Sequence, residues 1–110
     1  MNQCDPQKPR FRAGELPLLP RDQSDRLAAF AKALSDPIRV NMLHLLEQSA
    51  DLCTCEFEAI LGLTQSKVSY HLKVLLDAGL VTRETHGTWS HYSLVRKGIL
   101  AHLNTLCTFD

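Results

Sequence analysis

Two cysteines separated by a single threonine stand out in this sequence: Cys53 and Cys55, in the stretch DLCTCEFE at residues 51–58. Thiolates are soft ligands, and they select soft ions. The two residues are too close along the chain for an ordinary structural disulfide. The pair therefore predicts a binding site for a soft metal or metalloid ion, with thiol redox chemistry as the alternative.

The spacing of this thiol pair restricts the backbone conformations in which both sulfurs can bind one ion. Residues i and i+2 of a regular helix point about 200° apart, as the 3.6-residue period requires. Two cysteines within an ideal helix therefore cannot bind one atom, but they can do so at a loop-to-helix junction or in a distorted first turn. We hypothesise that ion binding changes the start of the helix that carries them. An ion-bound structure with an unchanged first turn would contradict this hypothesis.

A second polar pattern follows in LTQSKVSYHLKVLLDAGLV, at residues 63–81. Side chains that can hydrogen-bond recur there at helical spacing, at Ser66, Ser69, Tyr70 and Lys73. No acidic residue lies between Thr64 and Lys73. Such a face is typical of a helix that enters the major groove, because base edges and phosphates offer donors and acceptors. We expect DNA contacts from this helix and from the hairpin after it: Gln65, Ser66, Lys67, Ser69, Tyr70, His71, Lys73, Arg83, His86 and Thr88.

Five helices are expected to position these residues, and their apolar period begins at Ser24. Asp36 is expected to cap the second helix, with Pro37 at its first position. Gly62 and Gly79 are expected to end the third and fourth helices, because each follows the last periodic residue.

After the fourth helix the pattern changes to short runs of β-branched and aromatic residues, LVTRE and TWSHYSL, on either side of Gly87. These runs predict a β-hairpin. The fifth helix has an apolar face that includes Ile99, Leu103 and Leu106. The predicted fold is mainly α with a small β-hairpin, a winged helix-turn-helix.

Composition limits the possible functions. With 110 residues the chain is one small domain, expected at residues 22–110, after a mobile arm at residues 1–21 that holds four of the five prolines. Lys+Arg and Asp+Glu both number 12, so any nucleic-acid contact must come from a local patch. We expect no membrane span and no secretory signal, hence a cytoplasmic protein with reduced thiols.

No enzyme is expected from these patterns. The sequence has no serine–histidine–acid arrangement and no phosphate-binding glycine loop. A thiol–disulfide enzyme would need a Cys-x-x-Cys motif in a βαβ unit, whereas Cys53 and Cys55 are separated by one residue.

Three stretches, ALSDPIRVNMLHLL, CTCEFEAILGLTQSKVSYHLKVLLDAGLV and GTWSHYSL, together resemble the ArsR/SmtB family of metal-sensing repressors over residues 24–106. The likeness is to its arsenical-resistance repressors, in which a Cys-x-Cys pair precedes an acidic residue; here these are Cys53, Cys55 and Glu56. The resemblance implies a homodimer, joined through its first and last helices, that holds operator DNA until an ion binds. It also implies As(III) or Sb(III) as the inducer, bound by three thiolates.

The third thiolate is open. Cys107 matches relatives with a cysteine near the end of the last helix, and Cys4 matches cadmium- and lead-sensing relatives with an N-terminal arm. Glu58 stands where some arsenic repressors have a third cysteine, three residues after the pair. Two other functions on the same fold also stay open: a cadmium- or lead-responsive repressor, and a redox or persulfide sensor that pairs Cys53 or Cys55 with Cys107.

Overall fold

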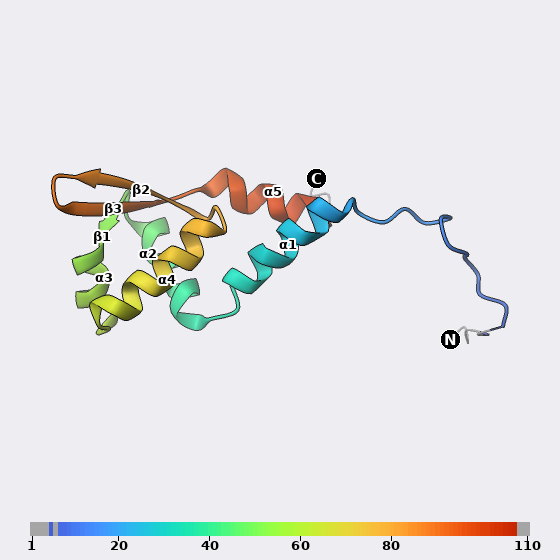
Figure 1. Ribbon diagram of the computed structural model, residues 1–110, viewed down its shortest axis with the longest axis horizontal. Helices are drawn as coiled ribbons and strands as arrows, with labels where there is room; N and C mark the ends of the chain where they lie inside the picture. Colours follow the sequence, from blue (N-terminus) through green and yellow to red (C-terminus); the bar gives the residue numbers. More distant parts are fainter. Residues whose placement is uncertain (1–4, 6, 108–110) are drawn as a thin grey trace.

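The computed structural model describes residues 5 and 7–107, and that part of the chain contains five helices and three strands (Figure 1). In chain order these are α1 (Arg21–Ala33), α2 (Pro37–Gln48), β1 (Leu52–Cys53), α3 (Thr54–Leu61), α4 (Gln65–Asp77), β2 (Val81–His86), β3 (Trp89–Leu94) and α5 (Arg96–Leu106). The predicted fold class is confirmed, although α1 begins three residues before Ser24.

The start of α2 follows the predicted capping chemistry. The Asp36 carboxylate accepts a hydrogen bond from the Ile38 N–H at 2.8 Å, and Pro37 takes the first helical position. Proline costs nothing at that position, because the N–H that it lacks would have no partner within the helix. This cap fixes where α2 leaves the short connection from α1.

The helix-turn-helix consists of α3 and α4. Gly62 ends α3 in the left-handed conformation, at φ 66°, where a side chain would be strained. The Thr64 hydroxyl then accepts from the Lys67 N–H at 3.3 Å and caps α4. Gly79, at φ 74°, follows α4 and turns the chain into β2. These turn residues were predicted from the sequence.

The hairpin is confirmed, and a third strand adds to it. β2 and β3 pair from Val81↔Leu94 to His86↔Trp89, around Gly87. The unpredicted strand β1 pairs with the other edge of β3, so that the sheet order is β1-β3-β2. Two residues are too few to show the alternation that identifies a strand in a sequence.

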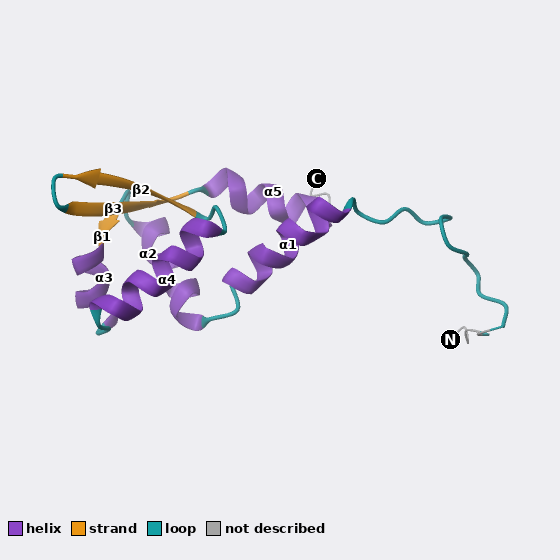
Figure 2. Cartoon of the chain, in the orientation of Figure 1, coloured by secondary structure: helices purple, strands orange, loops and turns teal. Residues whose placement is uncertain are grey.

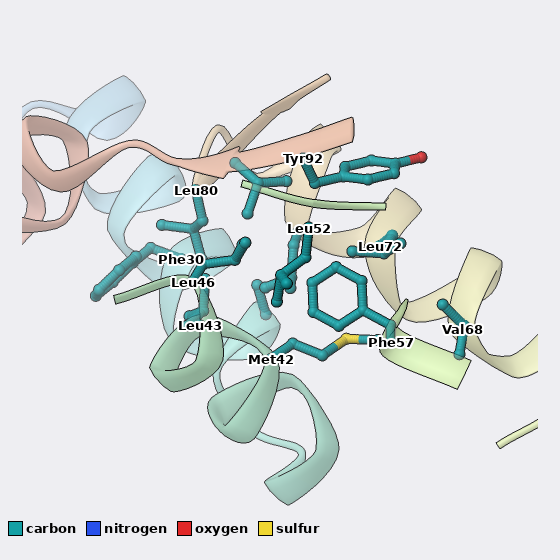
Figure 3. Close-up of a cluster of buried hydrophobic side chains, with 13 residues drawn as sticks. Phe30, Met42, Leu43, Leu46, Leu52, Phe57, Val68, Leu72, Leu80 and Tyr92 are labelled. Carbon is teal, nitrogen blue, oxygen red and sulfur yellow. The ribbon is translucent and has the colours of Figure 1, made fainter. Parts of the chain in front are cut away.

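The core lies where α2, α3 and α4 pack under the sheet. Figure 3 shows the Phe57 ring with Met42, Leu52 and Leu72 around it. The fully buried large side chains come from these helices and from the start of β2: Met42, Leu46, Phe57, Val68, Leu72, Leu75, Leu80 and Val81. The core therefore joins the helix-turn-helix to the wing in one unit.

Helices α1 and α5 lie against each other on the other side of the molecule from α3 (Figure 2). The Phe30 and His102 rings stack there with their centroids 4.6 Å apart. Every residue of α5 is at least partly exposed, and Leu100 and Leu106 are 60% and 66% exposed. Before α1, residues 7–19 contain no helix or strand and are exposed throughout.

Replacing Phe57 by alanine should lower the free energy of unfolding by about 3–5 kcal/mol, because the cavity cannot close fully. The matched control is Ile60→Ala on the same helix, where the side chain is 54% exposed. It should change stability by about 0.5 kcal/mol or less. Urea unfolding at one fixed protein concentration measures both, and equal losses would contradict this account of the core.

Candidate thiol site and nucleic-acid interface

The two thiols face each other at the start of α3, with their sulfur atoms 2.7 Å apart. Cys53 is the last residue of β1 and the N-cap of α3, in an extended conformation (φ −88°, ψ 165°). Cys55 is the second residue of the helix. Because Cys53 lies outside the helical turn, the 200° separation does not apply to this pair. Of the two geometries expected, the structure has the loop-to-helix junction.

Two neighbours hold Cys53 in place. In the sheet it pairs with His91 of β3, whose Nδ1 lies 2.9 Å from the Asp51 carboxylate. At the helix start, the Cys53 N–H donates to the Glu56 carboxylate at 2.9 Å, while the Glu56 N–H donates to the Cys53 sulfur. This is a capping box in which cysteine takes the place of serine or threonine. The sequence analysis noted Glu56 but missed its capping role, which the spacing Cys-x-x-Glu signals.

These contacts set the protonation of the site. The hydrogen bond with the Cys55 thiol, assisted by burial, raises the pKa of the Cys53 thiol from 9.0 to about 11. The pKa of Glu56 is lowered, chiefly by the hydrogen bond from the Cys53 N–H. At neutral pH the free site therefore holds Cys53 as a buried neutral thiol beside the exposed Cys55. A soft ion would replace that proton, since the thiolate is the ligand.

The predicted set of three cysteines does not assemble within one chain. Among residues 5 and 7–107, no group of three or more histidine, cysteine, aspartate or glutamate side chains is placed to hold a metal ion. Cys107 is the C-cap of α5, and α5 runs along α1, away from α3 (Figure 1). Cys4 lies outside the described residues. Within the described residues, only Cys53 and Cys55 of the predicted set therefore lie together.

Most of the predicted DNA contacts lie on the surface. The side chains of α4 that are exposed are Gln65, Ser66, Lys67, Ser69, Tyr70 and Lys73, and those of the wing are Arg83, His86 and Thr88. Two of these are in surface ion pairs, Lys73 with Asp77 at 3.2 Å and His86 with Glu84 at 3.5 Å. Exposed pairs of this kind are weak, so the side chains remain available to a phosphate.

His71 is the exception, and its assignment to the DNA face is wrong. The side chain is 7% exposed, and its Nδ1 lies 2.9 Å from Nη1 of Arg39. The cause is its place in the helix, three residues after Val68 and four before Leu75, on the buried stripe. The spacing of the apolar residues in α4 indicates this burial, and the expected DNA contact did not take it into account.

A groove of about 570 Å³ brings the thiol site and the DNA face together. It lies between α3, α4 and the hairpin, and Cys55 opens into it. The opposite walls carry predicted DNA contacts: Gln65, Ser69, Lys73, Arg83 and Thr88. The sequence analysis placed the pair on the helix that supports α4, but residues so far apart in the chain gave no sign of one common groove.

Comparison with known proteins identifies a family for the segment that forms the helix-turn-helix. A model of the bacterial regulatory protein arsR family matches residues 36–83, from the start of α2 into β2. The arsenical resistance operon repressor of Bacillus subtilis is 52% identical over 63 residues, which are 57% of this chain and 60% of that repressor. A helix-turn-helix transcriptional regulator of Methanocaldococcus jannaschii is 34% identical over 74 residues, 67% of this chain and 83% of that regulator.

Among solved structures, an ArsR-like transcriptional regulator from Rhodococcus sp. RHA1 is similar, with a TM-score of 0.71 at 26% identity. The match covers 77% of this chain and 79% of that one. The described part of the chain contains no helix long and apolar enough to cross a membrane.

Alkylation should distinguish the two thiols. At pH 8 a pKa of about 11 leaves Cys53 with about 100-fold less thiolate than a pKa of 9.0 would, partly offset by higher nucleophilicity. We expect iodoacetamide to modify Cys55 first, and the rate at Cys53 to rise as the pH approaches 11. In Cys55→Ala, Cys53 should react roughly tenfold faster than in wild type, since its hydrogen bond is gone.

Peptide mass spectrometry over time gives both rates, and Cys107→Ala is the control for the removal of a distant thiol. An unchanged rate at Cys53 in Cys55→Ala would show that the thiol–thiol hydrogen bond does not control this pKa.

Proposed function

This chain belongs to the arsR family of bacterial regulatory proteins, and from that premise we propose that it represses transcription by binding operator DNA as a homodimer. We propose further that it leaves the operator when As(III) or Sb(III) binds Cys53 and Cys55. The family is one of DNA-binding regulators and not of enzymes. The chain spans 60% of the length of the Bacillus subtilis repressor, so the inducer and partners are proposed from the site itself.

One observation carries the proposal: Cys55, whose thiol faces that of the buried Cys53, opens into the groove lined by predicted DNA contacts. Arsenic and antimony in the trivalent state are thiophilic, and soft thiolates select such ions. No other cluster of ligand-type side chains competes for an ion in the described part of the chain. The inducer would therefore bind next to the surface that it has to disable.

The proposed release mechanism starts at the contact between the two thiols. An ion bound by both sulfurs replaces this contact, and the capping box at Glu56, which uses the Cys53 sulfur and N–H, changes with it. Because Cys55 lines the groove, this change shifts α3 against α4 and the wing.

Helices α1 and α5 are proposed as the dimer interface. Leu100, Leu103 and Leu106 of α5 are exposed, and a second copy would cover them. A two-fold dimer places its recognition helices about one DNA turn apart, roughly 10 bp between half-site centres.

The third sulfur ligand comes either from Cys107 or from Cys4. Cys107 is not beside the pair, and Cys4 lies outside the described residues; for either cysteine, a contribution from the partner subunit is proposed. If Cys4 serves, the segment before α1 would be the arm that carries it. We propose a cytoplasmic location, because thiols stay reduced there and operator DNA is within reach.

A redox- or persulfide-sensing repressor is the second candidate. The observation in its favour is that Cys53, Cys55 and Cys107 are all free cysteines, and that Cys55 and Cys107 are exposed. The pairing of Cys53 or Cys55 with Cys107 would have to join two chains, because α5 runs away from α3 (Figure 1). This candidate predicts loss of DNA affinity on mild oxidation without any ion.

Arsenite should release the reduced protein from its operator, and Cys53→Ser or Cys55→Ser should abolish release while preserving operator binding. The serine hydroxyl is a poor ligand for a soft ion. Coupling of about 1–3 kcal/mol between ion and DNA is expected. Fluorescence anisotropy measures this on a duplex selected by the protein from random DNA, at fixed salt, titrated with arsenite and then with cadmium.

Release by arsenite alone supports the three-thiolate metalloid site. Release by cadmium alone points to a four-ligand site that includes Cys4. Release by neither favours the redox sensor, and release of Cys55→Ser by arsenite means that the ion binds elsewhere.

Operator affinity should depend on the α4 face independently of the thiols. Lys73→Ala should reduce the slope of log K against log salt by about 0.9 for each subunit, because one phosphate contact is lost. Ser69→Ala should cost about 1 kcal/mol of operator binding for each hydrogen bond lost. Arsenite affinity of the free dimer should stay unchanged in both.

The matched control is Lys97→Ala, an exposed lysine at the start of α5 and away from the groove. Equal salt slopes in Lys73→Ala and wild type would remove Lys73 from the interface.

A further inference from the structure

A buried guanidinium connects three helices on the side of α4 opposite the DNA face. Arg39, in the first turn of α2, is only 8% exposed. Its Nε donates to the Ala33 carbonyl at the end of α1, at 2.7 Å. Its Nη1 lies 2.9 Å from His71 Nδ1, in the middle of α4. One side chain thus contacts the end of α1 and the centre of the recognition helix.

Carbonyl oxygens and a carboxylate around Arg39 compensate its positive charge. A buried charge is costly unless it is paired and hydrogen-bonded. The last carbonyls of α1 lack partners within the helix and form the negative end of its dipole. Arg39 meets them at Ala33 and, at 3.5 Å, at Lys32, with the Asp36 carboxylate 3.9 Å away. Since Arg39 can only donate, His71 must accept through an unprotonated Nδ1.

Phe30 and Ala33 of α1 share the apolar core with α4, but an open space remains beside them. A groove of about 370 Å³ lies between the two helices, lined by Ala29 and Ala33 of α1 and by Tyr70 and Val74 of α4. Arg39 lies at this groove and bridges its two walls. The position of α4 relative to α1 therefore depends on this polar bridge as well as on apolar packing.

We infer that the Arg39–His71 hydrogen bond positions α4 relative to α1 and so sets the half-site spacing that the dimer accepts. This inference rests on the proposed function, in which α1 joins the subunits and α4 contacts DNA. In a two-fold dimer, any shift of α4 relative to α1 occurs in both subunits. The distance between the two recognition helices then changes by twice that shift. The bond also supports Tyr70, whose ring packs edge-on to that of His71 at 5.1 Å.

The test compares two substitutions that differ in one property. His71→Asn keeps a carbonyl acceptor for Arg39, whereas His71→Leu fills the space without an acceptor. The matched control is His44→Leu on the exposed face of α2. Operator binding is measured for each full-length protein on three duplexes, with half-sites at the selected spacing, one base pair closer and one base pair farther apart. Circular dichroism and arsenite titration check folding and the thiol site.

His71→Leu should bind the selected operator roughly tenfold more weakly and lose its preference among the three spacings, with unchanged arsenite affinity. His71→Asn and His44→Leu should keep the wild-type preference. If His71→Leu does not fold, Arg39→Lys replaces it in the test. Lysine keeps the positive charge but lacks the guanidinium's separate donors to Ala33 and His71, so the same loss of spacing preference is expected.

A folded His71→Leu with the wild-type spacing preference would overturn the inference, and so would a His71→Asn that behaves like His71→Leu. A wild-type protein that binds no duplex specifically would instead overturn the proposed function.

Discussion

The pairing of β1 with β3 fixes the point at which α3 begins, and the thiol site depends on that point. Because Leu52 and Cys53 are held in the sheet, the helix cannot extend backward to include Cys53. Had the helix begun one turn earlier, the two thiols would point to different sides. The same two residues attach the wing to the helix-turn-helix, with Leu52 buried in the core beside Phe57. The geometry of the thiol pair and the position of the wing therefore depend on one short strand.

Sequence reasoning succeeded where a pattern extends over many residues. The helix periods, the cap at Asp36, the glycine at residue 79 and the hairpin around Gly87 are all confirmed. It failed where information is sparse or lies in tertiary structure. β1 has only two residues, too few to form a pattern. His71 is polar, yet it lies at the spacing of the buried residues of α4, and only that spacing indicates its burial. The separation of Cys107 from the thiol pair follows from the direction in which α5 runs. The common groove joins residues of three elements that no local pattern relates.

The molecule has two functional sides with different construction. One contains α3, α4 and the wing, which share an apolar core and the groove. The other contains α1 and α5, and the leucines of α5 stay exposed. Arg39 lies between them and touches the end of α1 as well as α4. Apolar contacts have no preferred direction, so packed side chains can shift by small amounts. A charge-assisted hydrogen bond is directional and strong, so it fixes the position of α4 relative to α1 more closely.

The cysteine in the capping box bears on how such a sensor arises. Serine or threonine is the usual residue at that position, because its hydroxyl caps the first turn, and the Cys53 sulfur accepts the same hydrogen bond from Glu56. Serine and cysteine differ there by a single atom. A chain with serine at position 53 would keep its helix start and its wing and would lack only a soft ligand. Responsiveness to an ion can thus be gained or lost by exchanging oxygen for sulfur, with the DNA-binding scaffold left in place.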